Sequence, residues 1–70
     1  MDDLCIYQIE LQGQMDEREL NIMSPFEMRV VQANTASTLL AVRTDQSGLI
    51  GLMRHLHGHG FVLLSVRREQ

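Results

Sequence analysis

The chain has no lysine and no tryptophan, one cysteine, one proline and only three aromatic residues among its 70 residues. A single cysteine, Cys5, excludes an internal disulfide, and no Cys-x-x-Cys pair is present to hold zinc. The six basic residues are scattered arginines, so the sequence lacks both the basic stripe and the aromatic platform of a nucleic-acid binder. No apolar run approaches the roughly 20 residues of a membrane span, and the acidic start MDDL is unlike a signal peptide. We therefore expect a soluble, cytoplasmic protein with no nucleic-acid or membrane partner.

The length of the chain predicts one domain, residues 1–70. A core of this size supplies only about 3–5 kcal/mol of stability. Because the sequence offers neither an internal disulfide nor a Cys-x-x-Cys zinc site to add stability, association with another molecule is the remaining source of it.

Alternating apolar and polar residues predict four strands, at residues 4–12, 26–33, 37–44 and 61–67. Asp16 and Glu19 have the spacing of a capping box at the start of a short helix, which Ser24-Pro25 should end. Asp45 should cap a second helix whose core-facing residues are Leu49, Leu52, Met53 and Leu56. Gly58 or Gly60 should supply the left-handed stop of that helix.

The order strand, helix, strand, strand, helix, strand predicts an α+β fold of the ferredoxin-like, split βαβ type. Right-handed connections place both helices on one face of a four-stranded antiparallel sheet. The alternation then directs Tyr7, Ile9, Leu11, Val62, Leu64 and Val66 toward the helices. The opposite, open face should expose the apolar residues Ile6, Leu39, Ala41, Phe61 and Leu63.

Several sequence motifs along the chain resemble those of a family of short uncharacterised bacterial proteins. The resemblance rests on Tyr7-Gln8-Ile9, Gln12-Gly13, Met15 to Arg18, Thr44-Asp45-Gln46 with Leu49, Gly51 and Leu52, and Leu63 to Val66. It covers nearly the whole chain and departs from the family in the first helix, which has no tryptophan, and at His55 to His57. The resemblance implies a fold and no activity.

Residues 39–66 also resemble the first strand–helix–strand unit of an ACT domain. Domains of that kind bind amino acids in the loop between strand and helix. The likeness implies a ligand loop formed by Thr44, Asp45, Gly48 and Leu49.

Three histidines, His55, His57 and His59, are weak candidates for metal ligands, since imidazole binds zinc, copper and nickel. Their position near a helix C-terminus, where positive charge is favoured, explains them without a metal. The acidic residues Asp16, Glu17 and Glu19 are likewise explained by a helix start, and Cys5 by packing against the helices. We expect no cofactor, no resident metal and no catalytic residues.

Apolar patches on a protein surface usually mark contact with a partner. The sequence therefore predicts a non-catalytic interaction module that forms a homodimer, or binds another protein, through the open sheet face. Amino-acid sensing of the ACT kind and an enzyme built on the same fold are the alternatives.

Overall fold

The computed structural model describes residues 4–23 and 26–69. Its elements are β1 (Cys5–Gln12), α1 (Glu17–Met23), β2 (Met28–Ala33), β3 (Ser37–Thr44), α2 (Gln46–Gly58) and β4 (Leu63–Glu69). The predicted order of strands and helices is confirmed. The predicted end of α1 at Ser24-Pro25 lies outside the described residues.

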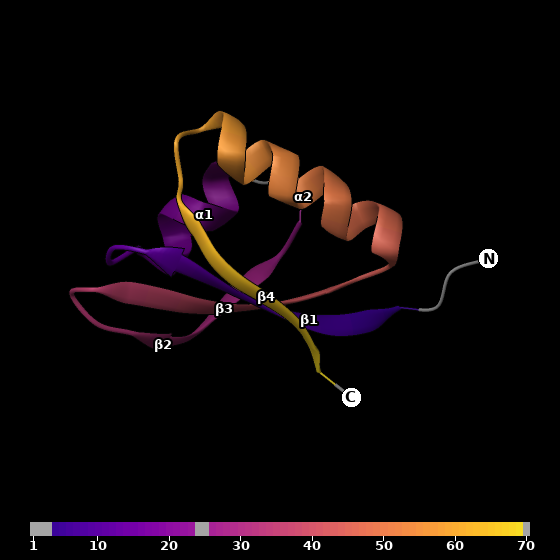
Figure 1. The fold of residues 1–70 in the computed structure, drawn as a ribbon, viewed down its shortest axis with the longest axis horizontal. Helices are drawn as coiled ribbons and strands as arrows, with labels where there is room; N and C mark the ends of the chain where they lie inside the picture. Colours follow the sequence, from indigo (N-terminus) through magenta and orange to yellow (C-terminus); the bar gives the residue numbers. More distant parts are fainter. Residues whose placement is uncertain (1–3, 24–25, 70) are drawn as a thin grey trace.

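The four strands form one antiparallel sheet in the order β2-β3-β1-β4. Figure 1 shows both helices above the sheet, on the same side of it. The fold is therefore α+β, with an open four-stranded sheet covered on one face by two helices. No helix within the described ranges is long and apolar enough to cross a membrane.

Side-chain and backbone caps set the ends of α2. The Asp45 carboxylate accepts a hydrogen bond of 2.7 Å from the N–H of Gly48, as the sequence predicts. At the other end, Gly60 has a φ of 87°, and its N–H donates to the carbonyl of His57. The N–H of Phe61 donates to the carbonyl of Leu56 at 3.1 Å, which completes a Schellman motif. Gly60, and not Gly58, is the stop.

The core lies between the sheet and the helices. Leu20 of α1 is fully buried, and so are Leu52 and Leu56 of α2. Leu49 of α2 is buried as well, and the strands contribute the buried apolar residues Tyr7, Ile9, Leu11, Met28, Leu40 and Val42. The predicted faces of β1 and β3 are thus correct.

The predicted faces of the last strand are wrong for four residues. Ser65 pairs with Glu10, and Leu63 pairs with the next residue of β1, Leu11. Leu64 is therefore an extra residue of β4 that has no partner position on β1. This bulge reverses the alternation on its N-terminal side. Leu63 therefore packs against the core, whereas Val62 and Leu64 are each 50% exposed.

The fourth of these residues is Phe61, which lies before β4. As the residue after Gly60 in the Schellman motif, it points back toward the last turn of α2 and packs against the core. Phe61 and Leu63 consequently do not belong to the open face, and Val66 alone of the three predicted core residues of this strand packs where the sequence predicts.

Candidate functional site

The strand register places three apolar residues together on the face that the helices leave uncovered. Ile6 of β1 is 42% exposed, and Leu39 and Ala41 of β3 are half-buried. Ala41 pairs with Gln8, so it is a diagonal neighbour of Ile6, and Leu39 is the next residue along β3 on the same face. We call Ile6, Leu39 and Ala41 the apolar centre. It contains three of the five residues predicted for the interface.

Polar side chains border the apolar centre on the β4 side. The amide of Gln8 donates to the carboxylate of Glu69 at 3.1 Å, and the Ser65 hydroxyl donates to the Glu10 carboxylate at 3.5 Å. Both bonds run between β1 and β4, so the exposed carboxylates on this side have partners within the sheet. The apolar centre is displaced toward β3 and β2.

Arginines complete the border. Arg29 pairs with Ala41, Arg43 with Ile6, and Arg67 with Gln8. The register thus surrounds the apolar centre with three arginines on this face, facing the glutamates Glu10 and Glu69. Charged residues of both signs therefore border the apolar centre.

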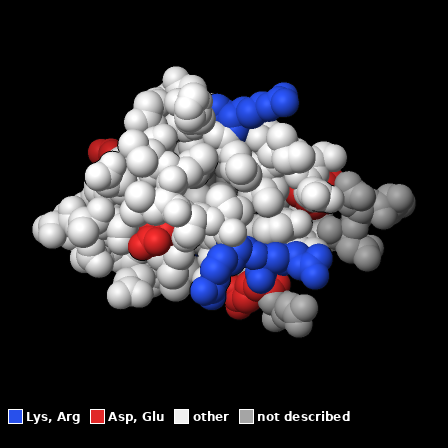
Figure 2. All heavy atoms as spheres, in the orientation of Figure 1, with Lys and Arg blue, Asp and Glu red and all other residues white. Residues whose placement is uncertain are grey.

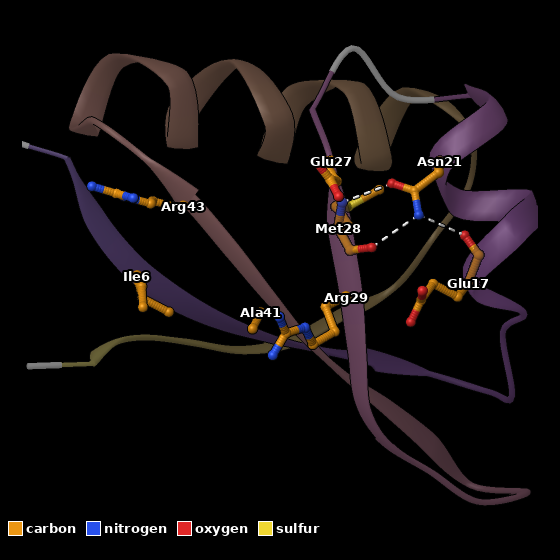
Figure 3. A pocket seen from close by; sticks show the side chains of 8 residues that line it. All are labelled: Ile6, Glu17, Asn21, Glu27, Met28, Arg29, Ala41 and Arg43. Atoms are coloured by element: carbon orange, nitrogen blue, oxygen red, sulfur yellow. Dashed lines mark hydrogen bonds between the residues drawn. The ribbon is translucent and has the colours of Figure 1, made fainter.

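The open face is hollowed at three neighbouring places. A depression of about 460 Å³ is lined on this face by Ile6, Ala41, Arg29 and Arg43, and it continues around the β2 edge. Figure 3 shows its remaining lining residues, Glu27 just before β2, Met28 on β2, and Glu17 and Asn21 on α1. A second, of about 470 Å³, shares Ile6 and Arg43 and continues to Leu4, Cys5, Arg68 and Glu69. A third, of about 200 Å³, lies over Gln8, Glu10, Leu39, Ser65 and Arg67. The open face is therefore uneven, with depressions on both sides of the apolar centre.

The edge of the sheet beside this face is closed by α1, which the sequence analysis missed. Asn21 accepts a hydrogen bond from the N–H of Met28 at 2.7 Å and donates to the carbonyl of the same residue at 2.9 Å. The Glu17 carboxylate accepts from the N–H of Val30 at 2.9 Å. Figure 3 shows Asn21 reaching across to β2. Asparagine is a poor helix former because its side chain competes for backbone groups. An asparagine inside the predicted helix was therefore the available sign that its side chain bonds to backbone outside the helix.

The predicted ligand loop is occupied by its own residues. Thr44 and Leu49 are buried, and the Asp45 side chain caps α2. A Cβ atom on Gly48 would overlap the Thr44 hydroxyl and come within 3.3 Å of Phe26. The loop is thus a tightly packed helix start, with its polar groups turned inward.

The three histidines lie at the end of α2, where two of the three rings approach each other. The rings of His55 and His59 have centroids 4.4 Å apart, and Nδ1 of His59 donates to the His55 carbonyl at 2.9 Å. His57 is exposed, two residues from either ring along the helix. Over the described part of the chain, no group of three or more histidine, cysteine or acidic side chains could hold a metal ion. Cys5 is half-buried and packs against the core.

A family model described as a domain of unknown function, DUF8691, matches residues 6–67. The match includes both helices and all or most of every strand, so it agrees with the expectation that the chain belongs to an uncharacterised family. No curated protein and no solved structure matches the chain.

Proposed function

Because the chain belongs to DUF8691, a family whose description names no activity, we propose a function from the surface itself: a non-catalytic interaction module that binds a second copy of the chain through the open sheet face. The observation that supports it is the apolar centre, which lies on β1 and β3 of the hollowed open face with charged residues around it. Contact with another molecule removes Ile6, Leu39 and Ala41 from water, which is favourable at about 25 cal/mol per Å² of apolar surface.

We further propose that the fold is of the ferredoxin-like type. The support is that α1 connects β1 to β2 and α2 connects β3 to β4, and that each pair of connected strands is separated by one other strand in the sheet. In this arrangement one sheet face is covered by the chain's own helices and the other is available to a partner.

Both edge strands of the sheet are unsuited to strand pairing, which favours association through the open face over association edge to edge. Asn21 and Glu17 occupy outward backbone groups of β2. At the opposite edge, β4 carries the bulge at Leu64 and the exposed residues Arg67 and Arg68, and bulges and charges both discourage strand pairing. The open face remains as the surface for a partner.

Charge favours a second copy of the chain over a strongly charged partner. Arginines and glutamates both border the apolar centre, so two copies can bring opposite charges together. On the side of the molecule shown in Figure 2, basic side chains form separate groups and no continuous basic stripe. This pattern is unlike a surface that tracks a phosphate backbone.

The size of the face sets the expected strength of the dimer. Four strands of this length cover roughly 20 Å by 25 Å, or about 500 Å² per copy. A standard interface buries about 800 Å² per partner. We therefore expect a weak dimer with a dissociation constant in the micromolar range.

The test is the mass of the protein in solution, measured by sedimentation at about 10 µM to 1 mM, a range that brackets weak dimers. The Ile6→Arg and Leu39→Arg variants place a charge in the apolar centre and should remain monomers of 8.0 kDa. Ile22→Arg is the matched control, because Ile22 is 84% exposed on α1 and lies off the face. A wild-type protein that stays monomeric throughout this range rules out the homodimer.

A second comparison decides between the face and another contact. If the wild type dimerises and Ile6→Arg and Leu39→Arg dimerise as strongly as Ile22→Arg, the contact is elsewhere.

The amino-acid-sensing alternative has no observation in its favour, since Thr44, Asp45, Gly48 and Leu49 contact one another and the core.

A further inference from the structure

The last turn of α2 brings two imidazole rings together on one side of the helix. His55 and His59 are four residues apart, which places them on adjacent turns of the same helical face. Their ring centroids are 4.4 Å apart and the ring planes are inclined by 48°. His57, between them in sequence, points to a different side of the helix because it is two residues from each.

The hydrogen bond of His59 fixes which of its nitrogens can bind a ligand. Nδ1 lies 2.9 Å from the His55 carbonyl oxygen, and a carbonyl only accepts, so Nδ1 carries the proton. In the neutral ring the lone pair is then on Nε2. A histidine that donates one N–H to a backbone carbonyl while its other nitrogen binds a metal is the usual arrangement in metal sites.

Two further properties suit a cation at this place. The C-terminus of a helix carries partial negative charge, which attracts positive ions. His59 is exposed and His55 is half-buried, so an ion can reach both rings from solvent and keep water molecules on its remaining positions. Each imidazole has two ring nitrogens, so a ring that hydrogen-bonds through one nitrogen can still bind a metal through the other.

We propose that His55 and His59 form a two-histidine chelate for a divalent transition-metal ion of the zinc, nickel or copper class. These ions favour imidazole nitrogen at about 2.0–2.1 Å, so adjacent ligand atoms stand about 3 Å apart. With His59 held by its hydrogen bond to the His55 carbonyl and the ring centroids 4.4 Å apart, the His55 ring has to rotate about its own side-chain bonds to bring its ligand nitrogen to this separation. His57 is not a ligand, and no third protein ligand is required.

Binding at this place should stabilise the fold, because the ion joins the last helical turn to the residue that caps it. His59 is the C-cap residue of α2, and its N–H donates to the carbonyls of His55 and Leu56. A ligand that binds only the folded chain adds about 2.7 kcal/mol at a hundred times its dissociation constant. The metal should therefore raise the melting temperature in a concentration-dependent way.

The experiment uses tag-free protein titrated with zinc, nickel and copper chlorides by calorimetry and by thermal unfolding. The wild type should bind one ion per chain and melt at a higher temperature with metal than with a chelator. His55→Gln and His59→Gln should each lose at least tenfold in affinity, together with the metal-dependent shift. His57→Gln is the matched control and should behave as the wild type does.

Two results overturn the site. The first is no saturable binding of any of the three ions by the wild type. The second is a loss of binding in His57→Gln as large as in His55→Gln, which would mean that the ion is held loosely by the whole histidine-rich segment. Melting temperatures of all variants in chelator show whether a variant fails to bind or fails to fold. Because Ile6 and Leu39 are not involved, the result is independent of the proposed dimer.

Discussion

The side chain of Asn21 pairs with the backbone of Met28 as a neighbouring strand would, accepting from its N–H at 2.7 Å and donating to its carbonyl at 2.9 Å. A helix residue thus satisfies both outward backbone groups of a residue on an edge strand. Edge strands with free backbone groups are templates for unwanted pairing, so this contact combines a structural bond with protection of the sheet.

Replacing Asn21 should therefore affect two measurements at once. Asn21→Ala removes both bonds to Met28 and should lower the free energy of unfolding by about 1–3 kcal/mol. It should also increase aggregation on prolonged incubation, because the β2 edge becomes available. Ile22→Ala is the control, since the neighbouring side chain is 84% exposed and should change neither chemical denaturation nor light scattering. An Asn21→Ala protein as stable and as dispersed as the control would contradict this role.

Two glycines of α2 should respond in opposite directions to alanine. A Cβ atom on Gly48 would overlap the Thr44 hydroxyl, which is part of a buried residue, so Gly48→Ala should destabilise the fold by about 1–3 kcal/mol. A Cβ atom on Gly51 meets nothing within 4 Å, and alanine is the better helix former, so Gly51→Ala should stabilise by about 0.5–1 kcal/mol. Urea denaturation of the two variants measures both changes, and a common sign for the two would refute the packing argument at Gly48.

Thr38 is a fully buried polar residue of β3 whose hydroxyl joins this strand to the segment between β1 and α1. Its oxygen accepts from the N–H of Met15 at 2.8 Å and its hydroxyl donates to the carbonyl of Gly13 at 2.8 Å. Thr38→Val keeps the shape but leaves both backbone groups without this partner, which should lower stability by about 1–3 kcal/mol. Thr35→Val at an exposed turn position is the comparison and should be neutral within about 0.5 kcal/mol. Equal midpoints in urea for the two variants would show that the Thr38 hydroxyl contributes nothing.

The sequence predicts those parts of the fold that depend on local chemistry. The alternation of β1 and β3, the cap at Asp45 and the leucine stripe of α2 each follow from neighbouring residues, and all are present. Gly60 and Phe61 also carried a readable signal. A glycine stop followed by an apolar residue is the pattern of a Schellman motif, which would have placed Phe61 in the core.

The bulge at Leu64 had no such signal. The segment from Leu63 to Val66 contains no glycine, proline, asparagine or aspartate, and strict alternation through it is chemically reasonable. The bulge arises from pairing with β1, fifty residues away in the chain, so only the assembled sheet decides whether Leu63 or Leu64 faces the helices. The predicted interface included Leu63 for this reason. Leu39 also lies beside a bulge, at Val31 of β2, but the extra residue belongs to the neighbouring strand and leaves the alternation of β3 unchanged.

The pairing of α1 with β2 was hidden for a similar reason. Asn21 and Met28 belong to different elements, and no short-range pattern specifies that a helix side chain will meet the edge of a strand. The open face, by contrast, follows from strand alternation and the number of helices, which are both legible in the sequence.

The seven residues of α1 are too few for a helix that persists alone in water. Its attachment to the rest of the molecule depends on Leu20 in the core and on the bonds from Asn21 and Glu17. Whenever this short segment detaches, β2 loses its cover in the same event, while the other three strands stay paired. Heat-induced aggregation should accordingly start from a nearly native molecule in which α1 has detached, at temperatures where most of the population is still folded.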